Sequence, residues 1–402
     1  MRKLKLIFTI IMLSLFFTDC SKGDSNDTII DTNLDKPSIS SNKSSLTFED
    51  TMLTRSSLAN SISISSKNLN SSINVSISDN FELSLDNITF QKSIILEPNK
   101  LKNVYVRFSP TELGNSTGNI KIENSQTSST DINLSGSGVK LRFNYKTFKK
   151  QHLAFGSGKS QSSIQKFDLH NDLKNVESIK MYIQLECPSG GCNAWDVYSN
   201  IMVKDPDSSE WFEIGRYITP YGIDNKKLER GFEIDVTDFK SQLKGNVELK
   251  SFIEVWGSDG WNLSVDFDYI IGDPDFTNYK VSRIIQYNGN SLQGVIYGED
   301  ESEFDLSKTI EIGEDVQNAH IRTIITGWGH ATPNDDNGRP CAEWCYRTHN
   351  IKINNINTFQ HYMGPIGCGS NPISPQNGNW EPDRAGWCPG MEVPIRLDKF
   401  TN

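Results

Sequence analysis

The stretch Cys187-Pro-Ser-Gly-Gly-Cys192-Asn-Ala-Trp195-Asp196 places a carboxylate directly after an indole, just past a loop that two cysteines bracket. A second stretch, Cys341-Ala-Glu343-Trp344-Cys345, repeats the combination over a shorter distance. Carboxylates are rarely buried without a partner, and a tryptophan on a loop presents a flat apolar face with one N–H donor. A rigid acid beside an aromatic platform favours a binding site for a sugar-bearing substrate.

Length and charge exclude some classes of function. The chain has 402 residues and a net charge of −10, and a chain of this length has room for roughly two or three domains of ordinary size. No run of lysine and arginine interrupts this acidic balance, so we expect no nucleic-acid partner.

The amino-terminal segment has the features of an export signal. Three basic residues precede an apolar run from Leu6 to Phe17, as in secretory signals. We predict a signal over residues 1–20 and a lipoprotein cleavage site with lipidation of Cys20, although Asp19 stands where a small residue is usual. Residues 21–36 are polar and predict a linker. The protein is therefore expected to be exported from a bacterium, either secreted or anchored to the outer membrane.

Six cysteines remain after Cys20, and all lie beyond residue 186. An even set in an exported protein predicts disulfides. The spacings favour three bridges: Cys187 with Cys192, Cys341 with Cys345, and Cys368 with Cys388. The alternative is a four-cysteine zinc site, because the first two pairs have four and three intervening residues, which such sites allow.

Short alternating strands separated by polar turns predict an all-β chain. In residues 37–138, runs such as Ser72–Ile77 and Val104–Phe108 indicate an immunoglobulin-like β-sandwich. This part has no cysteine, histidine or tryptophan, so we expect it to act as a spacer or in adhesion. Its glycine and proline pattern, from Phe108-Ser-Pro110 to Leu134-Ser-Gly-Ser-Gly138, resembles modules of the abnormal-spindle/hydin type.

All eight tryptophans and all six histidines lie after Val139. Strand signals continue there, and they include Tyr279–Val281 beyond a turn-rich break at Gly272–Asp275. No glycine-rich phosphate loop follows a strand, so antiparallel layers are expected.

Three carboxylates stand out as candidate catalytic groups: Asp196, Glu343 and Glu254. Glu254 lies two residues before Trp256 in a strand-like run, so the two side chains share a face. Further candidate binding residues are aromatic or cationic neighbours of these acids: Trp195, Trp256, Trp344, Trp387, Trp328, His330 and Arg384. Each also has a plainer explanation as a solvated loop acid, a core tryptophan, an ion-pair partner or a loop histidine.

Metal and serine chemistry lack their usual patterns. The six histidines contain no His-x-His or His-x-x-x-His pair, so no preformed metal face is predicted. No Gly-x-Ser-x-Gly elbow is present. We therefore predict hydrolysis driven by carboxylates, with no metal and no cofactor.

From about Lys146 to Pro394 the chain resembles the peptide-N-glycosidase F family, exported bacterial amidases that remove N-linked glycans from glycoproteins. The matching motifs include Glu186-Cys-Pro188, Trp195-Asp196, Gly327-Trp-Gly-His330, Cys341-Ala-Glu-Trp-Cys345 and Pro382-Asp-Arg-Ala-Gly-Trp-Cys-Pro-Gly390.

The resemblance implies a fold of two side-by-side eight-stranded jelly rolls, with the site between them. The first would occupy residues 141–273 and the second residues 279–402, where it would be incomplete because the family usually extends further. The implied reaction is hydrolysis of the amide between asparagine and the innermost N-acetylglucosamine, which releases a glycosylamine and leaves aspartate.

By the same resemblance Asp196 matches the principal catalytic carboxylate, and Glu343 and Glu254 match two assisting acids. The family usually has an arginine where this chain has Val197, so we expect a cationic donor to be missing near the sugar. N-glycosylated proteins are the expected substrates, and the protein is expected to be a monomer. The alternatives are a glycan-binding protein without turnover and a copper monooxygenase, which would need histidine clusters.

Overall fold

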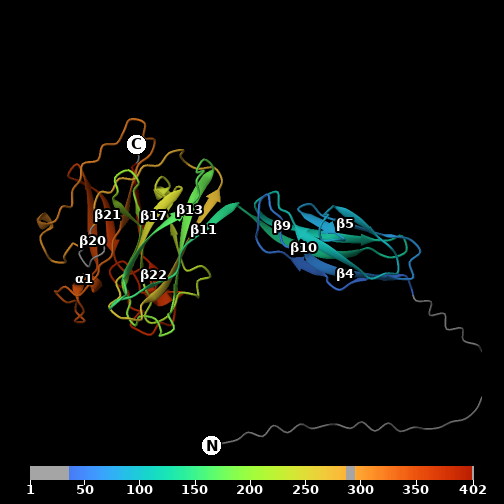
Figure 1. Cartoon of the computed structure of the whole chain (residues 1–402), viewed down its shortest axis with the longest axis horizontal. Coiled ribbons are helices and arrows are strands. Elements are labelled where there is room, and N and C mark those ends of the chain that lie inside the picture. Colours follow the sequence, from blue (N-terminus) through green and yellow to red (C-terminus); the bar gives the residue numbers. More distant parts are fainter. Residues whose placement is uncertain (1–35, 287–294, 401–402) are drawn as a thin grey trace, which may run out of the picture. The chain divides into compact units, whose positions relative to one another are not determined.

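The computed structural model describes residues 36–286 and 295–400, which divide into two compact units (Figure 1). The predicted signal at 1–20 with Cys20, and residues 21–35 of the predicted linker, lie outside the described residues. Regular structure is almost all strand, and the α-helical part of the described chain is the four-residue α1 (Cys341–Trp344). Among these residues, no helix has the length and apolarity needed to cross a membrane.

The first unit is built on a two-sheet sandwich, coloured blue to teal in Figure 1. Alternating burial drives its formation: in β8, Val104, Val106 and Phe108 are fully buried, while the residues between them are partly exposed, as expected for strands with one face on a core. One sheet has the order β1 (Ser38–Ser41), β4 (Asn60–Lys67), β8 (Lys102–Phe108), β6 (Phe81–Ser84). The other has the order β2 (Ser45–Thr47), β10 (Thr130–Val139), β9 (Gly114–Glu123), β5 (Ile73–Ile77), β7 (Ser93–Leu96), with β3 (Thr51–Met52) also on β10.

Eight further strands form a jelly roll, coloured green to yellow in Figure 1. Its sheets have the orders β11-β18-β13-β16 and β12-β17-β14-β15. Counted from its own first strand, these are orders 1-8-3-6 and 2-7-4-5, the double Greek key of a jelly roll. The strands are β11 (Arg142–Leu153), β12 (Ser162–Asp168), β13 (Val176–Glu186), β14 (Tyr198–Lys204), β15 (Trp211–Ile218), β16 (Phe232–Asp235), β17 (Asn246–Ile253) and β18 (Trp261–Ile271).

Two facing sets of alternate side chains fill the jelly-roll core. Ile179 and Ile183 of β13, and Leu263 and Phe267 of β18, are fully buried in the same cluster. β14 differs because six consecutive residues from Tyr198 are buried. A strand buried on both faces needs a second covering layer, so the sheet that carries β14 is covered on its outer face too.

The carboxyl-terminal segment supplies that covering layer. Tyr198, Ile218 and Phe252 pack against Trp387 and Val393. The short strand β22 (Met391–Glu392) pairs with β15 and extends the sheet.

A buried ion pair also stabilises the contact between this sheet and the carboxyl-terminal segment. Arg216 donates to Glu213 through Nε at 2.8 Å and through a terminal nitrogen at 2.7 Å, and its other terminal nitrogen reaches Thr326 at 3.0 Å. Two parallel N–H···O bonds give such a pair a fixed geometry. The outer face of the β14 sheet is therefore tied to the segment around Thr326 in a defined orientation.

After Ile271 the chain has little regular structure in the part that is described. The remaining elements there are β19 (His320–Ile324) paired with β23 (Ile395–Lys399), the hairpin of β20 (Arg347–Ile353) and β21 (Ile356–Met363), and the 3-10 turns η2 (Glu301–Glu303) and η3 (Cys368–Ser370). A third 3-10 turn, η1 (Thr237–Phe239), lies earlier, between β16 and β17. Among the described residues this part thus forms two separate two-stranded sheets, and its assignment as an incomplete second jelly roll stays a prediction.

The strand predicted at Tyr279–Val281 is wrong. That segment is irregular, and its apolar side chains pack without a strand partner: the Tyr279 ring lies 4.9 Å from the ammonium of Lys240, and Val281 packs on the jelly-roll core. The β-forming residues of this run pack against the jelly roll, and they do not pair with another strand.

Replacing Ile183 by alanine tests the jelly-roll core. Ile183 is fully buried, so Ile183→Ala should lower the free energy of unfolding by about 2–5 kcal/mol. Ile164→Ala on β12, where the side chain is 54% exposed, should change it by less than about 0.5 kcal/mol. Denaturant unfolding of both variants measures the contrast, and equal losses would contradict this assignment of the core.

Candidate active site

The six described cysteines are joined in disulfides with the pairing predicted from their spacing. Cys187–Cys192, Cys341–Cys345 and Cys368–Cys388 have Cα–Cα distances of 4.3, 4.4 and 5.3 Å. The four-cysteine zinc alternative is wrong, because bridged sulfurs are not thiolate ligands. The first two bridges hold the loops that carry Asp196 and Glu343.

Asp196 lies between the first disulfide loop and β14. The adjacent Val197 is clamped to Thr219 by two hydrogen bonds, from Val197 N to the Thr219 hydroxyl at 2.9 Å and from Thr219 N to the Val197 carbonyl at 3.1 Å. The Asp196 side chain is only 10% exposed. The strand end thus fixes the carboxylate at a nearly buried position.

Arg384 connects two of the predicted acids. Its side chain is completely buried, and its guanidinium lies 3.3 Å from the Glu343 carboxylate and 3.9 Å from that of Asp196. It donates to the Pro382 carbonyl at 2.6 Å and also to the carbonyl of Asn379. A buried guanidinium needs such partners on every N–H, so the orientation of Arg384 is strongly constrained.

The rings of Trp344 and Trp387 complete the surroundings of this cation. Their centroids lie 4.5 and 5.5 Å from the Arg384 guanidinium carbon. The guanidinium carbon of Arg339 also lies 4.3 Å from the centroid of the Trp344 ring. Because cations are attracted to the ring face, these contacts help to hold Trp344 beside Glu343.

Glu343 lies within α1, inside the second disulfide loop. Its carbonyl accepts the Ala385 N–H at 2.8 Å, which joins the helix to the backbone directly after Arg384. Its side chain is 14% exposed. The ionisable groups that act on its carboxylate also include His330 and Arg339.

Glu254 lies just past the end of β17, beside the start of β14. Its N–H donates to the Tyr198 carbonyl at 2.9 Å, which places it at the same end of the sheet as Asp196. Its carboxylate accepts from the Trp256 indole at 3.5 Å, so the two side chains share one side as predicted. Glu254 is therefore near Asp196 at one end of the sheet, but it is not one of the two acids that lie beside Arg384.

Burial raises the pKa values of all three acids. For Asp196, burial raises the pKa to about 7, against the opposing effects of a Tyr221 hydrogen bond and the Arg384 charge. For Glu254, burial raises the pKa to about 7, and the Trp256 hydrogen bond opposes it. Burial also raises the pKa of Glu343, which Arg384 counteracts. Perturbed carboxyls gathered at one place are typical of active sites.

Two of the predicted tryptophans form exposed platforms. Trp195 is 68% exposed and its ring meets that of Tyr221 edge-on at 6.4 Å, while Trp256 is 57% exposed and lies 5.1 Å from Phe155. Each tryptophan is more than half exposed and has one other aromatic ring packed beside it. These geometries suit stacking against a sugar or peptide group.

Trp387 and Trp328 have a different setting. Trp387 is 1% exposed, donates its N–H to the Gly327 carbonyl and packs against Trp328 at 4.9 Å between ring centroids. The structure gives Trp387 a packing role beneath Arg384 rather than a surface for a ligand. Trp328 is half-buried and His330 is exposed, and their predicted contact with substrate stays a prediction.

Val197 fills the core beside the site. Its side chain is 6% exposed and belongs to the jelly-roll core. The cations that act on the acids are Arg384 and, for Glu343, Arg339 as well. The expectation that a cationic donor is missing near the sugar stays a prediction.

Tyr221 and Phe155 are site residues that the sequence analysis did not single out. Tyr221 contacts Asp196 and Arg384, and the N–H of Phe155 donates to the carbonyl of Gly257, directly after Trp256, at 2.9 Å. A neutral phenol or phenyl ring far along the chain carries no local signal, and only the fold brings it to the site.

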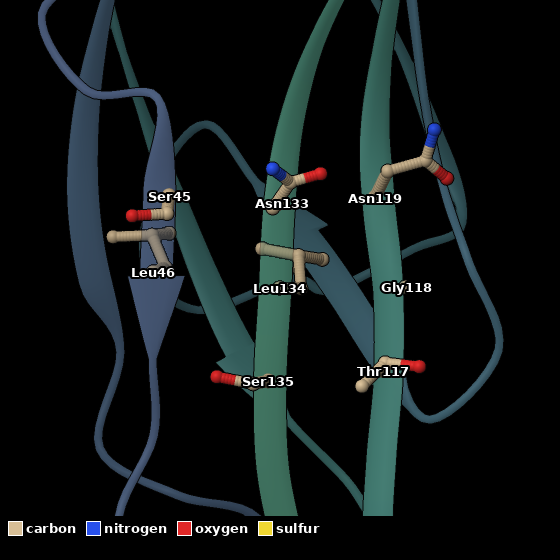
Figure 2. A pocket seen from close by; sticks show the side chains of 8 residues that line it. All are labelled: Ser45, Leu46, Thr117, Gly118, Asn119, Asn133, Leu134 and Ser135. Carbon is tan, nitrogen blue, oxygen red and sulfur yellow. The ribbon is translucent and has the colours of Figure 1, made fainter.

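Other candidate sites in the described chain are less suited to chemistry. Cys368, Asp383 and Cys388 lie close together, but both sulfurs form a disulfide and Asp383 accepts N–H bonds from Gly367 and Cys368. Figure 2 shows a groove on the first unit, and its lining has no acid, base or aromatic ring. The lining residues are Ser45, Leu46, Thr117, Gly118, Asn119, Asn133, Leu134 and Ser135.

Comparisons with known protein families match both parts of this site. Residues 196–269 match the family model "Peptide-N-glycosidase F, N terminal", and residues 297–402 match "Peptide-N-glycosidase F, C terminal". Residues 36–139, which contain the strands of the amino-terminal sandwich, match "Cep192 domain 4".

A characterised relative and solved structures agree. The chain is 52% identical over 260 residues to peptide-N(4)-(N-acetyl-beta-D-glucosaminyl)asparagine amidase F of Elizabethkingia miricola. The matched region covers 64% of this chain and 73% of that protein. Two solved structures are each 50% identical with a TM-score of 0.61, and each match covers 65% of this chain and 84% of theirs. One is described as a peptide-N(4)-(N-acetyl-beta-D-glucosaminyl)asparagine amidase at 2.2 Å resolution and the other as PNGase F, a glycosylasparaginase from Flavobacterium meningosepticum. The chain therefore belongs to the peptide-N-glycosidase F family.

Proposed function

We propose that this chain hydrolyses the amide between asparagine and the innermost N-acetylglucosamine of N-linked glycoproteins, with Asp196, Glu343 and Glu254 as the acids that perform it. The reaction follows from membership of the amidase family, whose characterised relative is named for it. The observation that carries the residue assignment is the convergence of Asp196 and Glu343 on the buried Arg384.

Asp196 is assigned to the attack on the amide carbon. An amide resists neutral water, so a base must take a proton from the attacking water. Burial raises the pKa of Asp196 to about 7, which places it near the pH at which a base is both ionised and strong enough to act. One of its carboxylate oxygens is buried without a hydrogen-bond partner, which leaves it available to a water or to the substrate.

Glu343 and Arg384 act as a unit beside that base. Arg384 contacts both carboxylates and balances part of their charge, which keeps two acids in one nearly dry site. With its pKa raised by burial, Glu343 holds the second water or the amide in position. It can also give a proton to the leaving nitrogen as that nitrogen becomes an amine.

Glu254 is assigned to the sugar side of the site. It has no cation among the charged groups that shift its pKa, so burial keeps it protonated up to about pH 7. A protonated carboxyl can donate to a sugar oxygen, while the exposed ring of Trp256 beside it offers a stacking face. Trp195 offers a comparable face next to Asp196.

The variant Asp196→Asn tests the base. General acid–base catalysis contributes about a hundredfold to ten-thousandfold in rate, so this variant should release glycans at least about a hundredfold more slowly from a denatured glycoprotein. Asp273→Asn, which changes an exposed carboxylate, is the matched control and should keep full activity. Retention of more than about a tenth of the activity in Asp196→Asn would contradict the role.

The same assay separates the amidase from a glycan-binding protein without turnover. Mass spectrometry of the treated peptide should show asparagine converted to aspartate at each freed site. A protein that binds the glycopeptide but leaves both glycan and asparagine unchanged would support the binding alternative.

A stability measurement tests whether the buried Glu254 carboxyl destabilises the folded protein when it is ionised. Its pKa is raised above the unfolded value, so the folded state holds a proton that the unfolded state releases, and the penalty grows as pH rises from about 4.5 to about 7. Glu254→Gln keeps the shape and the indole hydrogen bond without the charge. It should raise the Tm by several degrees at pH 8, because about 1–3 kcal/mol of penalty is removed.

Below about pH 4.5 both states hold the proton, and the gain should vanish. A pH series of thermal unfolding measures this, with activity assayed alongside. A Tm that falls equally at both pH values would show that Glu254 stabilises the fold and is not a costly functional group.

We also propose that the protein is exported and anchored through Cys20, which the apolar run before it supports. In a Gram-negative host the full chain should appear in the membrane fraction with a lipid-modified amino-terminal cysteine, and Cys20→Ser should lose the modification and become soluble. Unmodified Cys20 in both fractions would contradict the anchor. The monomeric state stays a prediction.

A further inference from the structure

Tyr221 is held at the site by contacts from a distant part of the chain. Its N–H donates to the Gln376 side-chain oxygen at 2.9 Å, and its carbonyl accepts the Asn377 N–H at 3.1 Å. Its ring lies flat against Gly378, where an added Cβ would come within 2.2 Å of Cδ1. Only glycine fits this approach, so the phenol has one available position.

The direction of the hydrogen bonds around its hydroxyl follows from donor chemistry. A terminal nitrogen of Arg384 donates to the Tyr221 oxygen at 3.2 Å, and arginine has no acceptor. The hydroxyl must therefore accept from Arg384 and send its own proton elsewhere. Asp196 is the neighbouring acceptor, because a hydrogen bond from Tyr221 is among the influences that lower the pKa of the Asp196 carboxyl.

The proton stays on Tyr221 throughout the working pH range. Burial raises the pKa of the phenol well above its ordinary value, and the negative charge of Asp196 raises it further. Tyr221 is thus a fixed neutral donor, whereas the guanidinium of Arg384, at 3.9 Å, is too far from Asp196 for a direct hydrogen bond.

We infer that Tyr221 is a positioning residue for the reaction: it delivers the hydroxyl hydrogen bond that keeps Asp196 ionised and fixes the direction of its carboxylate. This inference rests on the proposed role of Asp196 as the base. The other ionisable groups that act on Asp196 are Arg384, which favours the ionised form, and Glu343, which opposes it. His330 and Arg339 act one step away, on Glu343.

Removing the hydroxyl isolates this one contact. Tyr221→Phe keeps the ring that packs on Gly378 and Trp195 and deletes only the hydrogen bonds of the oxygen. A hydrogen bond to a charged group supports about one unit of pKa, so the ascending limb of kcat against pH should move up by about one unit. The rate should fall about tenfold at pH 6 and change less than about twofold at pH 9, with KM little altered.

A direct measurement avoids relying on activity. The ¹³C chemical shift of the Asp196 side-chain carboxyl, followed by NMR titration, should report the same upward shift in Tyr221→Phe. Tyr182→Phe, on the opposite sheet of the jelly roll beside Arg230, is the matched control and should leave both the pH profile and the Asp196 titration unchanged.

The possible outcomes distinguish the role of Tyr221 from the role of Asp196. An Asp196 titration and a pH limb that stay in place in a folded Tyr221→Phe protein would overturn the role of Tyr221 while leaving Asp196 as the base. Activity that survives in Asp196→Asn would overturn the proposed catalytic residues regardless of the Tyr221 result. A uniform loss of kcat at every pH, with no shift of the limb, would show a merely structural contribution and would also overturn the inference.

Discussion

A fully buried guanidinium is the constraint on which the site depends. Arg384 has no exposed surface, and a buried cation is tolerated only when charges and hydrogen bonds compensate it. The compensation comes from both parts of the chain: Asp196 and Tyr221 belong to the jelly roll, and Glu343 belongs to the later helix α1. The two acids therefore meet only when the carboxyl-terminal loops are packed on the sheet.

That packing is prepared by the sheet itself. Because β14 is buried on both faces, its outer residues cannot be left to water without cost, and Trp387 covers them beside Arg384. The Arg216–Glu213 pair and its bond to Thr326 then fix the orientation of the covering segment. Burial of apolar side chains favours the packing of this segment on the sheet. The buried polar contacts then allow only one orientation of the segment, because buried polar groups need partners in a specific geometry.

Local patterns predicted much of this structure, because their causes are local. Cysteine spacing gave the disulfide loops, alternation gave the strands of the first sandwich, and the two-residue step from Glu254 to Trp256 placed both on one side. Tyr221 escaped prediction because its partners Gln376 and Arg384 lie far along the chain. The inward side of Val197 and the burial of Trp387 were also missed, since a residue's type does not tell which of two layers will cover it.

The two acids whose pKa values lie near 7 reach them by different balances. Asp196 is opposed by Arg384 and Tyr221, whereas Glu254 faces an indole and no cation. Under the proposed roles this difference separates the two carboxyls. The Arg384 charge and the Tyr221 hydroxyl favour the ionised form of Asp196, which suits a base. Glu254 has no cation among the groups that shift its pKa, so burial favours its protonated form, which suits a donor.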